Sequence, residues 1–371
     1  MRPASILVVA FVVALGAAHA VASSADNNAP YGNAVVFDGM TGARDARFPM
    51  LLGTGAAVAD GSGGFYVSGG SVDGPAGAIS HVRADGSLDA AFLVTVSGTA
   101  PAALARSGRR LYLGGNFAGV GGQVRHGLAA VDVRTGRVLT WAPTFRSEGG
   151  GIRGALTLAV AGGTVIAGGV GHVTAFDGRT GRKRWSLDVD EANDRSVPVV
   201  NGVVETQVVV GGRLFVAGAF DQVRRAGGGK WIRVGPRAVP AELDPRTGRV
   251  LPWRAARSVG DEIFSLAASG NTLFAAGHGS GYRVALRNGR VLGAIKGRPT
   301  EVAAANGRLY LGGNLRDRLG IPGRNNLAAI DLGTGRITAF APKLTKLQSV
   351  GAIVVSGTHV LVLGEFVQSV G

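Results

Sequence analysis

The sequence contains no cysteine, and it has only 3 methionines, 24 acidic residues and 6% aromatic residues in 371. Without cysteine the fold has no disulfide, and neither a thiolate metal site nor a cysteine nucleophile is available. After the first residues there is no apolar run near the roughly 20 residues that a membrane-spanning helix needs. We therefore expect no transmembrane span in the mature chain.

The first 22 residues have the pattern of a secretory signal peptide. Arg2 supplies a positive charge, Ile6–Ala17 is almost continuously apolar, and small residues alternate over Ala18–Ala22. The apolar stretch is too short to span a bilayer, which favours a cleaved signal over the alternative, a retained N-terminal anchor. The predicted protein is secreted, and either extracellular or associated with the cell envelope.

Glycine and positive charge are abundant. Glycine occupies 62 of 371 positions without a triplet period, which excludes collagen and indicates many short strands joined by tight turns. The formal net charge is +15, a field that attracts anionic partners. An arginine-rich compositional bias explains the charge equally well, and nucleic acid is a poor partner for an exported protein.

A repeat organises nearly the whole chain. The two clearest copies each combine an apolar strand ending in Gly-Gly, an Asp-x-x-Thr-Gly turn and an aromatic residue: Arg109–Phe117, Leu128–Arg137 and Trp141 in one, and Gly307–Leu315, Leu327–Arg336 and Phe340 in the other. Weaker copies begin near Phe65, Thr164, Gly212 and Thr272. The spacing of about 49 residues is that of a propeller blade.

Each copy predicts four short antiparallel strands. In the Asp-x-x-Thr-Gly turn, the Asp and Thr oxygens can accept backbone N–H bonds, and glycine takes the positive φ without steric cost. The aromatic residue at the end of the fourth strand suits packing between neighbouring blades. Radial repetition of four-stranded units gives a propeller.

The two ends of the chain complement each other. Ala34–Gly42 with Phe48 forms the second half of a repeat, and Val360–Phe366 forms the first half. Six internal copies and this composite predict an all-β, seven-bladed β-propeller of four-stranded antiparallel blades. Pairing of N- and C-terminal strands, two from each end, would close one blade and cover its edges. A β-solenoid would not need complementary ends, so we expect residues 23–371 to form a single, monomeric propeller domain.

Two family resemblances follow from these motifs. The Val-Gly-Gly, Leu-Ala-Ala-Val-Asp and Trp-Ala-Pro elements resemble the delta-60 repeat of bacterial secreted β-propellers, and Ala175–Trp185 resembles the repeat of pyrroloquinoline-quinone-like propellers. The likeness covers essentially residues 31–371 and implies a fold rather than an activity. Quinone-dependent dehydrogenases typically have eight blades, a vicinal cysteine pair and an acidic calcium site, so their activity and cofactor are not expected here.

Catalytic and metal motifs are scarce. There is no Gly-x-Ser-x-Gly elbow and no phosphate-binding loop, and the histidines do not have ligand spacing. Asp188, Asp190 and Asp194 form a weak calcium candidate, but their segment lacks the glycine and closing glutamate of an EF-hand loop. We therefore expect no cofactor and no metal. An extracellular hydrolase or lyase, with acidic residues at the mouth of the propeller channel, is the alternative function.

The preferred hypothesis is a non-catalytic module that binds a protein, a glycan or an anionic envelope polymer. Three loops between second and third strands are long, at 114–127, 218–237 and 312–326, and should open on one face. Arginines beside an aromatic residue can bind anionic groups by charge pairing and stacking. The candidate residues are Arg125, His126, Arg224, Arg225, Lys230, Trp231, Arg233, Arg237, Arg316, Arg318 and Arg324. Solvated basic loops are the alternative interpretation of the same residues.

Overall fold

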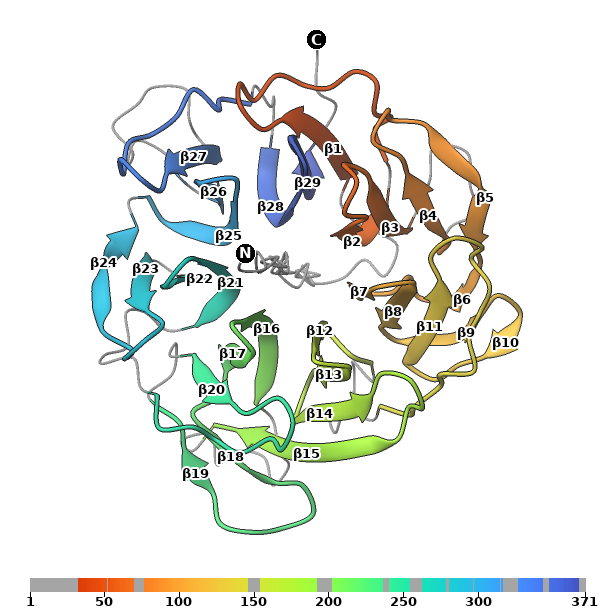
Figure 1. The fold of residues 1–371 in the computed structure, drawn as a ribbon, viewed down its shortest axis with the longest axis vertical. Helices are drawn as coiled ribbons and strands as arrows, with labels where there is room; N and C mark the ends of the chain where they lie inside the picture. Colours follow the sequence, from red (N-terminus) through yellow and green to blue (C-terminus); the bar gives the residue numbers. More distant parts are fainter. Residues whose placement is uncertain are drawn as a thin grey trace, which may run out of the picture.

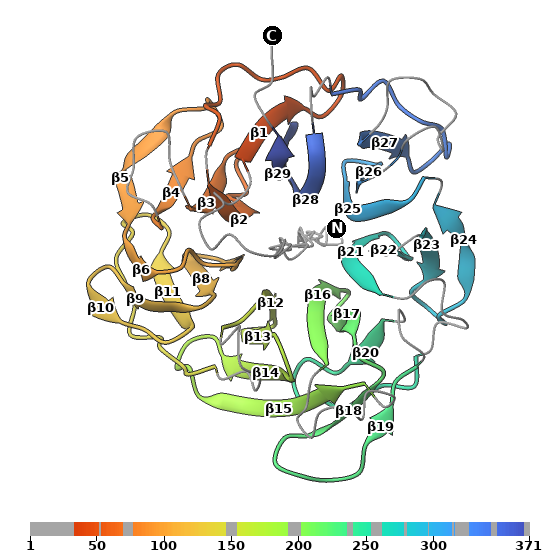
Figure 2. The same cartoon turned by 180° about the vertical axis from the view of Figure 1, so that it is seen from behind.

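The computed structural model describes residues 33–366, except 52, 70–76, 146–153, 192–201, 236–239, 254–261, 278–279, 296, 314, 316–325 and 343–346. The described residues form strands, turns and bends. No helix occurs among them, and so none that could cross a membrane. Small antiparallel sheets stand side by side around a common centre, following one another in chain order (Figures 1 and 2). The all-β prediction is therefore confirmed for this part of the chain.

The strand nearest the centre is the first strand of each repeat. These strands are β2 (Thr54–Ala59), β7 (Ala103–Ser107), β12 (Thr157–Ala161), β16 (Val203–Val210), β21 (Ile263–Ser269), β25 (Pro299–Ala305) and β28 (Leu347–Ser356). Each lies beside the next in chain order, and β28 lies beside β2. Most of their described side chains are buried, as expected for apolar strands covered on both faces.

The second and third strands follow outward. The second strands are β3 (Phe65–Gly69), β8 (Arg110–Gly114), β13 (Thr164–Gly168), β17 (Arg213–Ala219), β22 (Thr272–Gly277), β26 (Arg308–Gly313) and β29 (His359–Phe366). The third strands are β4 (Ile79–Val82), β11 (Leu128–Asp132), β14 (His172–Asp177), β20 (Ala241–Leu243), β23 (Ser280–Ala285), β27 (Leu327–Asp331) and β1 (Asn33–Asp38).

The outermost strand is regular in only part of the sheets. It is present as β5 (Leu88–Val94), β15 (Lys183–Asp190) and β24 (Val291–Ile295). Elsewhere the Asp-x-x-Thr-Gly turn leads only to isolated bridges, such as Val131 with Val138 and Leu243 with Val250. Pro252 lies two residues after the Val250 bridge and cannot donate to a longer ladder. The prediction of four full strands in every repeat therefore holds for some repeats only, and the others have isolated bridges in place of the fourth strand.

The N-terminal strand pairs with the C-terminal one. All six residues of β1 face a partner on β29, from Asn33 opposite Gly364 to Asp38 opposite His359, and β28 pairs with the other edge of β29. Val36 and Phe37 of β1 are buried, at 4% and 1% exposure. Segments more than 300 residues apart in the sequence therefore share one sheet.

The hydrophobic core lies between neighbouring sheets rather than within one of them. One cluster, for example, joins Tyr112 and Leu128 of one sheet to Leu158 and Phe176 of the next, with Trp141 between them. The Trp141 indole Nε1–H donates to Asp177 O at 2.8 Å, and Trp185 donates in the same way to Pro245 O at 3.0 Å. The aromatic residue that ends each repeat thus packs against the turn of the following sheet, as predicted.

The predicted turn chemistry is confirmed at Asp177–Gly181. Asp177 Oδ1 accepts the Thr180 backbone N–H at 2.7 Å and the Thr180 hydroxyl at 2.9 Å. Gly181 has φ = 76°, a region where a side chain is strained. A hydrogen bond from Arg184, together with those from Thr180, holds the pKa of Asp177 well below its usual range.

Candidate binding surface

The long segment 218–237 forms a hairpin on the outer rim. Its strands β18 (Gln222–Arg225) and β19 (Ile232–Arg233) extend the sheet of the preceding repeat to six strands, in the order β12-β13-β14-β15-β18-β19. Leu187 of β15 lies opposite Arg225, and Asp190 lies opposite Gln222. The segment that we expected to open as a loop on one face is instead paired along a neighbouring outer strand, at the periphery in Figure 1.

Arg224 anchors this hairpin. Its Nε donates to Asp188 Oδ2 at 2.9 Å, and its guanidinium lies 4.4 Å from the centre of the Trp231 ring. The Asp188 side chain is 6% exposed, and its other oxygen lies 3.2 Å from His172 Nδ1. Because Arg224 balances a buried carboxylate, its first role is structural, and its removal would leave Asp188 with less compensation.

The remaining candidates on this hairpin divide into anchored and exposed groups. Arg233 pairs with the buried Asp221 at 2.9 Å, and Arg225 Nη2 donates to Thr247 O at 3.0 Å. Lys230 is exposed, and Ile232 keeps 49% of its surface accessible. The sequence identified the basic residues of this surface but not the apolar Ile232 among them.

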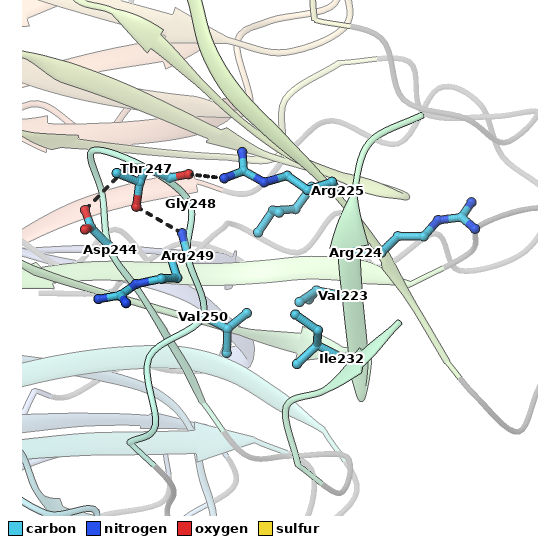
Figure 3. A pocket seen from close by; sticks show the side chains of 10 residues that line it. Val223, Arg224, Arg225, Ile232, Asp244, Thr247, Gly248, Arg249 and Val250 are labelled. Atoms are coloured by element: carbon cyan, nitrogen blue, oxygen red, sulfur yellow. Dashed lines mark hydrogen bonds between the residues drawn. The ribbon is translucent and has the colours of Figure 1, made fainter. Parts of the chain in front are cut away.

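A groove lies between the hairpin and the Asp244–Gly248 turn of its own repeat. We call it the rim groove; its volume is about 440 Å³, and Figure 3 shows it from close by. It is lined by Leu187, Val223, Arg224, Arg225, Ile232, Asp244, Thr247, Gly248, Arg249 and Val250. Arg225 reaches across to Thr247, whereas the Arg224 side chain points away from the turn (Figure 3). Arg249, which follows the turn, also lines the groove and is not among the residues predicted from the sequence.

The segment 114–127 forms a related hairpin. Its strands β9 (Phe117–Val120) and β10 (Gln123–Val124) join β6 (Val96–Gly98), which follows β5 of the preceding repeat. Arg125 donates to Gln123 Oε1 at 2.8 Å and to Leu139 O at 2.9 Å, and His126 is exposed. Arg125 therefore ties this hairpin to its own repeat. The other predicted residues, Arg237, Arg316, Arg318 and Arg324, lie outside the described residues.

Two of the three residues of the calcium candidate, Asp188 and Asp190, bond to other side chains. Asp188 is engaged by Arg224 and His172, and Asp190 Oδ2 accepts a bond from Gln222 Nε2 at 3.1 Å. Asp194 lies outside the described residues. Over the part of the chain that the structure describes, no group of three or more His, Cys, Asp or Glu could hold a metal ion.

Histidine–aspartate pairs are a feature that the sequence did not reveal. His81 lies between Asp60 and Asp89, with nitrogen–oxygen distances of 3.1 and 3.0 Å, and stacks on Tyr66 at 4.4 Å. Burial alone would lower the pKa of His81, but the hydrogen bonds to both carboxylates outweigh it and raise that pKa. The partners are 8 and 21 residues away in sequence, so no spacing motif signals the cluster.

One acid lies buried on an inner strand. Glu301 of β25 is 3% exposed, and burial raises its pKa well above the usual value despite a hydrogen bond with Ser265. The Glu205 charge raises it further. A carboxyl this buried is covered by its surroundings rather than presented at a channel mouth, as the hydrolase alternative would require.

Radial antiparallel sheets joined by interlocking aromatic residues and turns define a β-propeller, here with hairpins added to its rim. Residues 35–234 match the family described as outer membrane protein assembly factor BamB, a family of pyrroloquinoline-quinone-like repeats. The chain belongs to this family. The predicted pyrroloquinoline-quinone-like resemblance is thereby confirmed, whereas the resemblance to delta-60 repeats stays a prediction. No curated protein matches the sequence.

Solved propellers share the fold at low identity. BamB from Moraxella catarrhalis has a TM-score of 0.50 and 16% identity, covering 85% of this chain and 87% of that one. The WD40 β-propeller domain of Doa1 has a TM-score of 0.52 and 13% identity, covering 90% and 97%. The computationally designed Ika8 protein has a TM-score of 0.51 and 14% identity, covering 88% and 94%. At such identities the likeness shows the fold alone.

Proposed function

We propose that this chain is an exported, non-catalytic β-propeller of the cell envelope that binds another protein through the hairpin β18–β19. The observation that carries the proposal is an exposed apolar residue, Ile232, held among arginines on a rigidly anchored hairpin. Two ion pairs to buried carboxylates, Arg224–Asp188 and Arg233–Asp221, fix the hairpin before any partner arrives. Such preorganisation lowers the entropic cost of binding.

Family membership supports a protein partner over a glycan or an envelope polymer. The family takes its description from an outer membrane protein assembly factor, a role that consists of contacts with other proteins. A signal peptide at residues 1–22 would export the mature chain to the cell envelope, where an outer membrane protein assembly factor acts.

Seven blades in one domain complete the proposed architecture. Over the described residues, the blade that joins the two ends holds one regular N-terminal strand, β1, beside β29 and β28, rather than the predicted two strands from each end. The cycle of neighbouring inner strands from β2 through β28 and back to β2 supports the count. The pairing of β1 with β29 supports the mode of closure. Closure in a single blade removes the exposed edges of an open array, which suits a soluble monomer.

The test is capture of envelope proteins by the purified, immobilised mature chain. We expect Ile232→Asp to reduce the captured protein about tenfold, because truncated anchor residues typically cost more than 1 kcal/mol. Met40→Asp is the matched control: Met40 is 57% exposed but lies in the Asp38–Gly42 turn, away from the hairpin. Equal capture by both variants would refute the assigned surface. If capture survives protease treatment of the extract, the partner is a glycan or an envelope polymer and not a protein.

A further inference from the structure

The rim groove runs along an open sheet edge. Asp244 N donates to Arg249 O and Leu251 N donates to Glu242 O, both at 2.9 Å, so segment 249–251 pairs with β20 on one side. Val250 stands between these two bonds, opposite Leu243. In this antiparallel arrangement the N–H and C=O of Val250 point away from β20. Neither group bonds to another backbone group within the described residues.

The opposite wall of the groove is also a sheet edge. Strand β19 is the outermost member of the six-stranded sheet, and Ile232 lies on it. Beyond Ile232 and Val250 a second hollow of about 220 Å³ continues the groove past Val234, Leu251 and Pro252. Both walls therefore offer strand geometry, and the apolar side chains of Ile232, Val250 and Leu251 lie along the surface between them.

The free charge at the groove is positive. The Asp244 carboxylate already accepts the backbone N–H groups of Arg246 and Thr247, at 2.8 and 3.3 Å. Arg249 is exposed, and its guanidinium bonds to no group in the described ranges. Arg225 uses one nitrogen for Thr247 O and keeps its other donors. An occupant with acidic side chains complements this rim.

A second repeat shows the same edge already covered. Val138 occupies the position of Val250, and a Cβ added to Gly121 would lie 2.6 Å from Val138 Cγ2, so the hairpin β9–β10 packs directly on it. Arg125 then donates to Leu139 O. In the hairpin β18–β19, Gly227 and its neighbours Gly228 and Gly229 have nothing within 4 Å of an added Cβ. Among the residues that the structure describes, the chain fills one edge itself and leaves the other open.

We infer that the rim groove binds an extended, acidic segment of a partner protein by strand addition. This inference rests on the proposed function and names the partner's recognised element. The segment pairs with the N–H and C=O of Val250 that point away from β20, places alternate apolar side chains against Ile232 and Val223, and directs acidic side chains to Arg225 and Arg249. Main-chain bonds supply affinity and the alternate side chains supply specificity in this recognition mode.

The test uses labelled peptides of about eight residues and the unaltered mature chain, with binding followed by fluorescence anisotropy. A peptide that alternates valine and glutamate should bind, and one of equal composition with its valines in a block should bind about tenfold more weakly. Two further peptides carry N-methyl groups on alternate amides, in the two possible registers. We expect one register to lose binding and the other to retain it, since an edge strand uses every second amide. Equal binding in both registers would overturn strand addition.

Charge reversal locates the site. Arg225→Glu combined with Arg249→Glu should weaken the alternating peptide about tenfold, whereas Arg336→Glu should change it less than about twofold. Arg336 is the matched control because it is exposed and follows the equivalent Thr-Gly turn of another repeat. Unchanged binding in the double variant would overturn the site. If no peptide binds while Ile232→Asp still reduces protein capture, the proposed function stands and this inference falls. If no peptide binds and Ile232→Asp leaves capture unchanged, both fall.

Discussion

Removal of the N-terminal strand should unfold the whole protein, not only its own sheet. Residues 33–51 place five large apolar side chains in the core, each at most 4% exposed: Val35, Val36, Phe37, Phe48 and Leu51. At about 1.5–3 kcal/mol per buried side chain, they contribute roughly 7–15 kcal/mol as an upper estimate. A folded domain is typically stable by only about 5–15 kcal/mol. The loss is therefore as large as the entire stability.

Removal of β1 would also expose the edge of β29 that β1 covers. The same sheet contains β28, which lies between β25 and β2, so its disruption would reach both neighbouring sheets. We expect a chain that begins after residue 51 to be aggregated in size-exclusion chromatography and to show no cooperative urea transition. A synthetic peptide of residues 33–51, added during refolding, should restore the transition because it replaces the missing strand. The same peptide carrying Phe37→Asp serves as the control and should fail, since Phe37 is 1% exposed. A truncated monomer that unfolds at the urea concentration of the full chain would refute the reasoning.

Three further predictions concern single residues. Gly248→Ala should destabilise the protein by about 1–3 kcal/mol more than Gly335→Ala in urea unfolding. Both glycines have φ = 69°, but an added Cβ lies 2.7 Å from the Trp185 ring at Gly248 and meets nothing within 4 Å at Gly335. Equal losses of stability in the two variants would contradict this packing. The wild type should lose stability as the pH rises through the pKa of His81, which is raised in the folded state. A histidine with a raised folded pKa stabilises the fold fully only below its unfolded value of about 6.5. His81→Gln should reduce this dependence of the unfolding free energy on pH, and an unchanged dependence would show that the His81 cluster does not cause it. Glu301→Gln should be more stable than the wild type at pH 8 but not at pH 4. The pKa of Glu301 is raised in the folded state, and such a glutamate destabilises the fold above its unfolded pKa of about 4.3. A variant that is less stable at both pH values would show that the fold requires the carboxyl group.

The local chemistry of the repeat could be predicted from the sequence because it depends on neighbours in the chain. The Asp177 side chain bonds to Thr180 three residues later, and this spacing is visible in the letters. The shortened outer strands were not predicted, although one proline that limits such a strand, Pro252, is visible in the sequence. Its effect depends on which strand lies at the edge.

The candidate surface could be predicted only in part. The basic residues of segment 218–237 were recognised, but their partners Asp188 and Asp221 were not, because the Arg224–Asp188 bond joins residues 36 positions apart on different repeats. Likewise, nothing in the sequence distinguishes the covered Val138 from the open Val250, since both follow the same turn.

The sequence by itself determined the all-β character, the repeat and the complementary halves at the two ends, because each is written in local apolar patterns and turn residues. The tertiary structure alone decided that segments 114–127 and 218–237 become hairpins on neighbouring sheets, which carboxylates their arginines neutralise, and where an edge stays open among the described residues. Those outcomes depend on the packing of one repeat against the next, and that contact brings together residues that no short window of sequence contains.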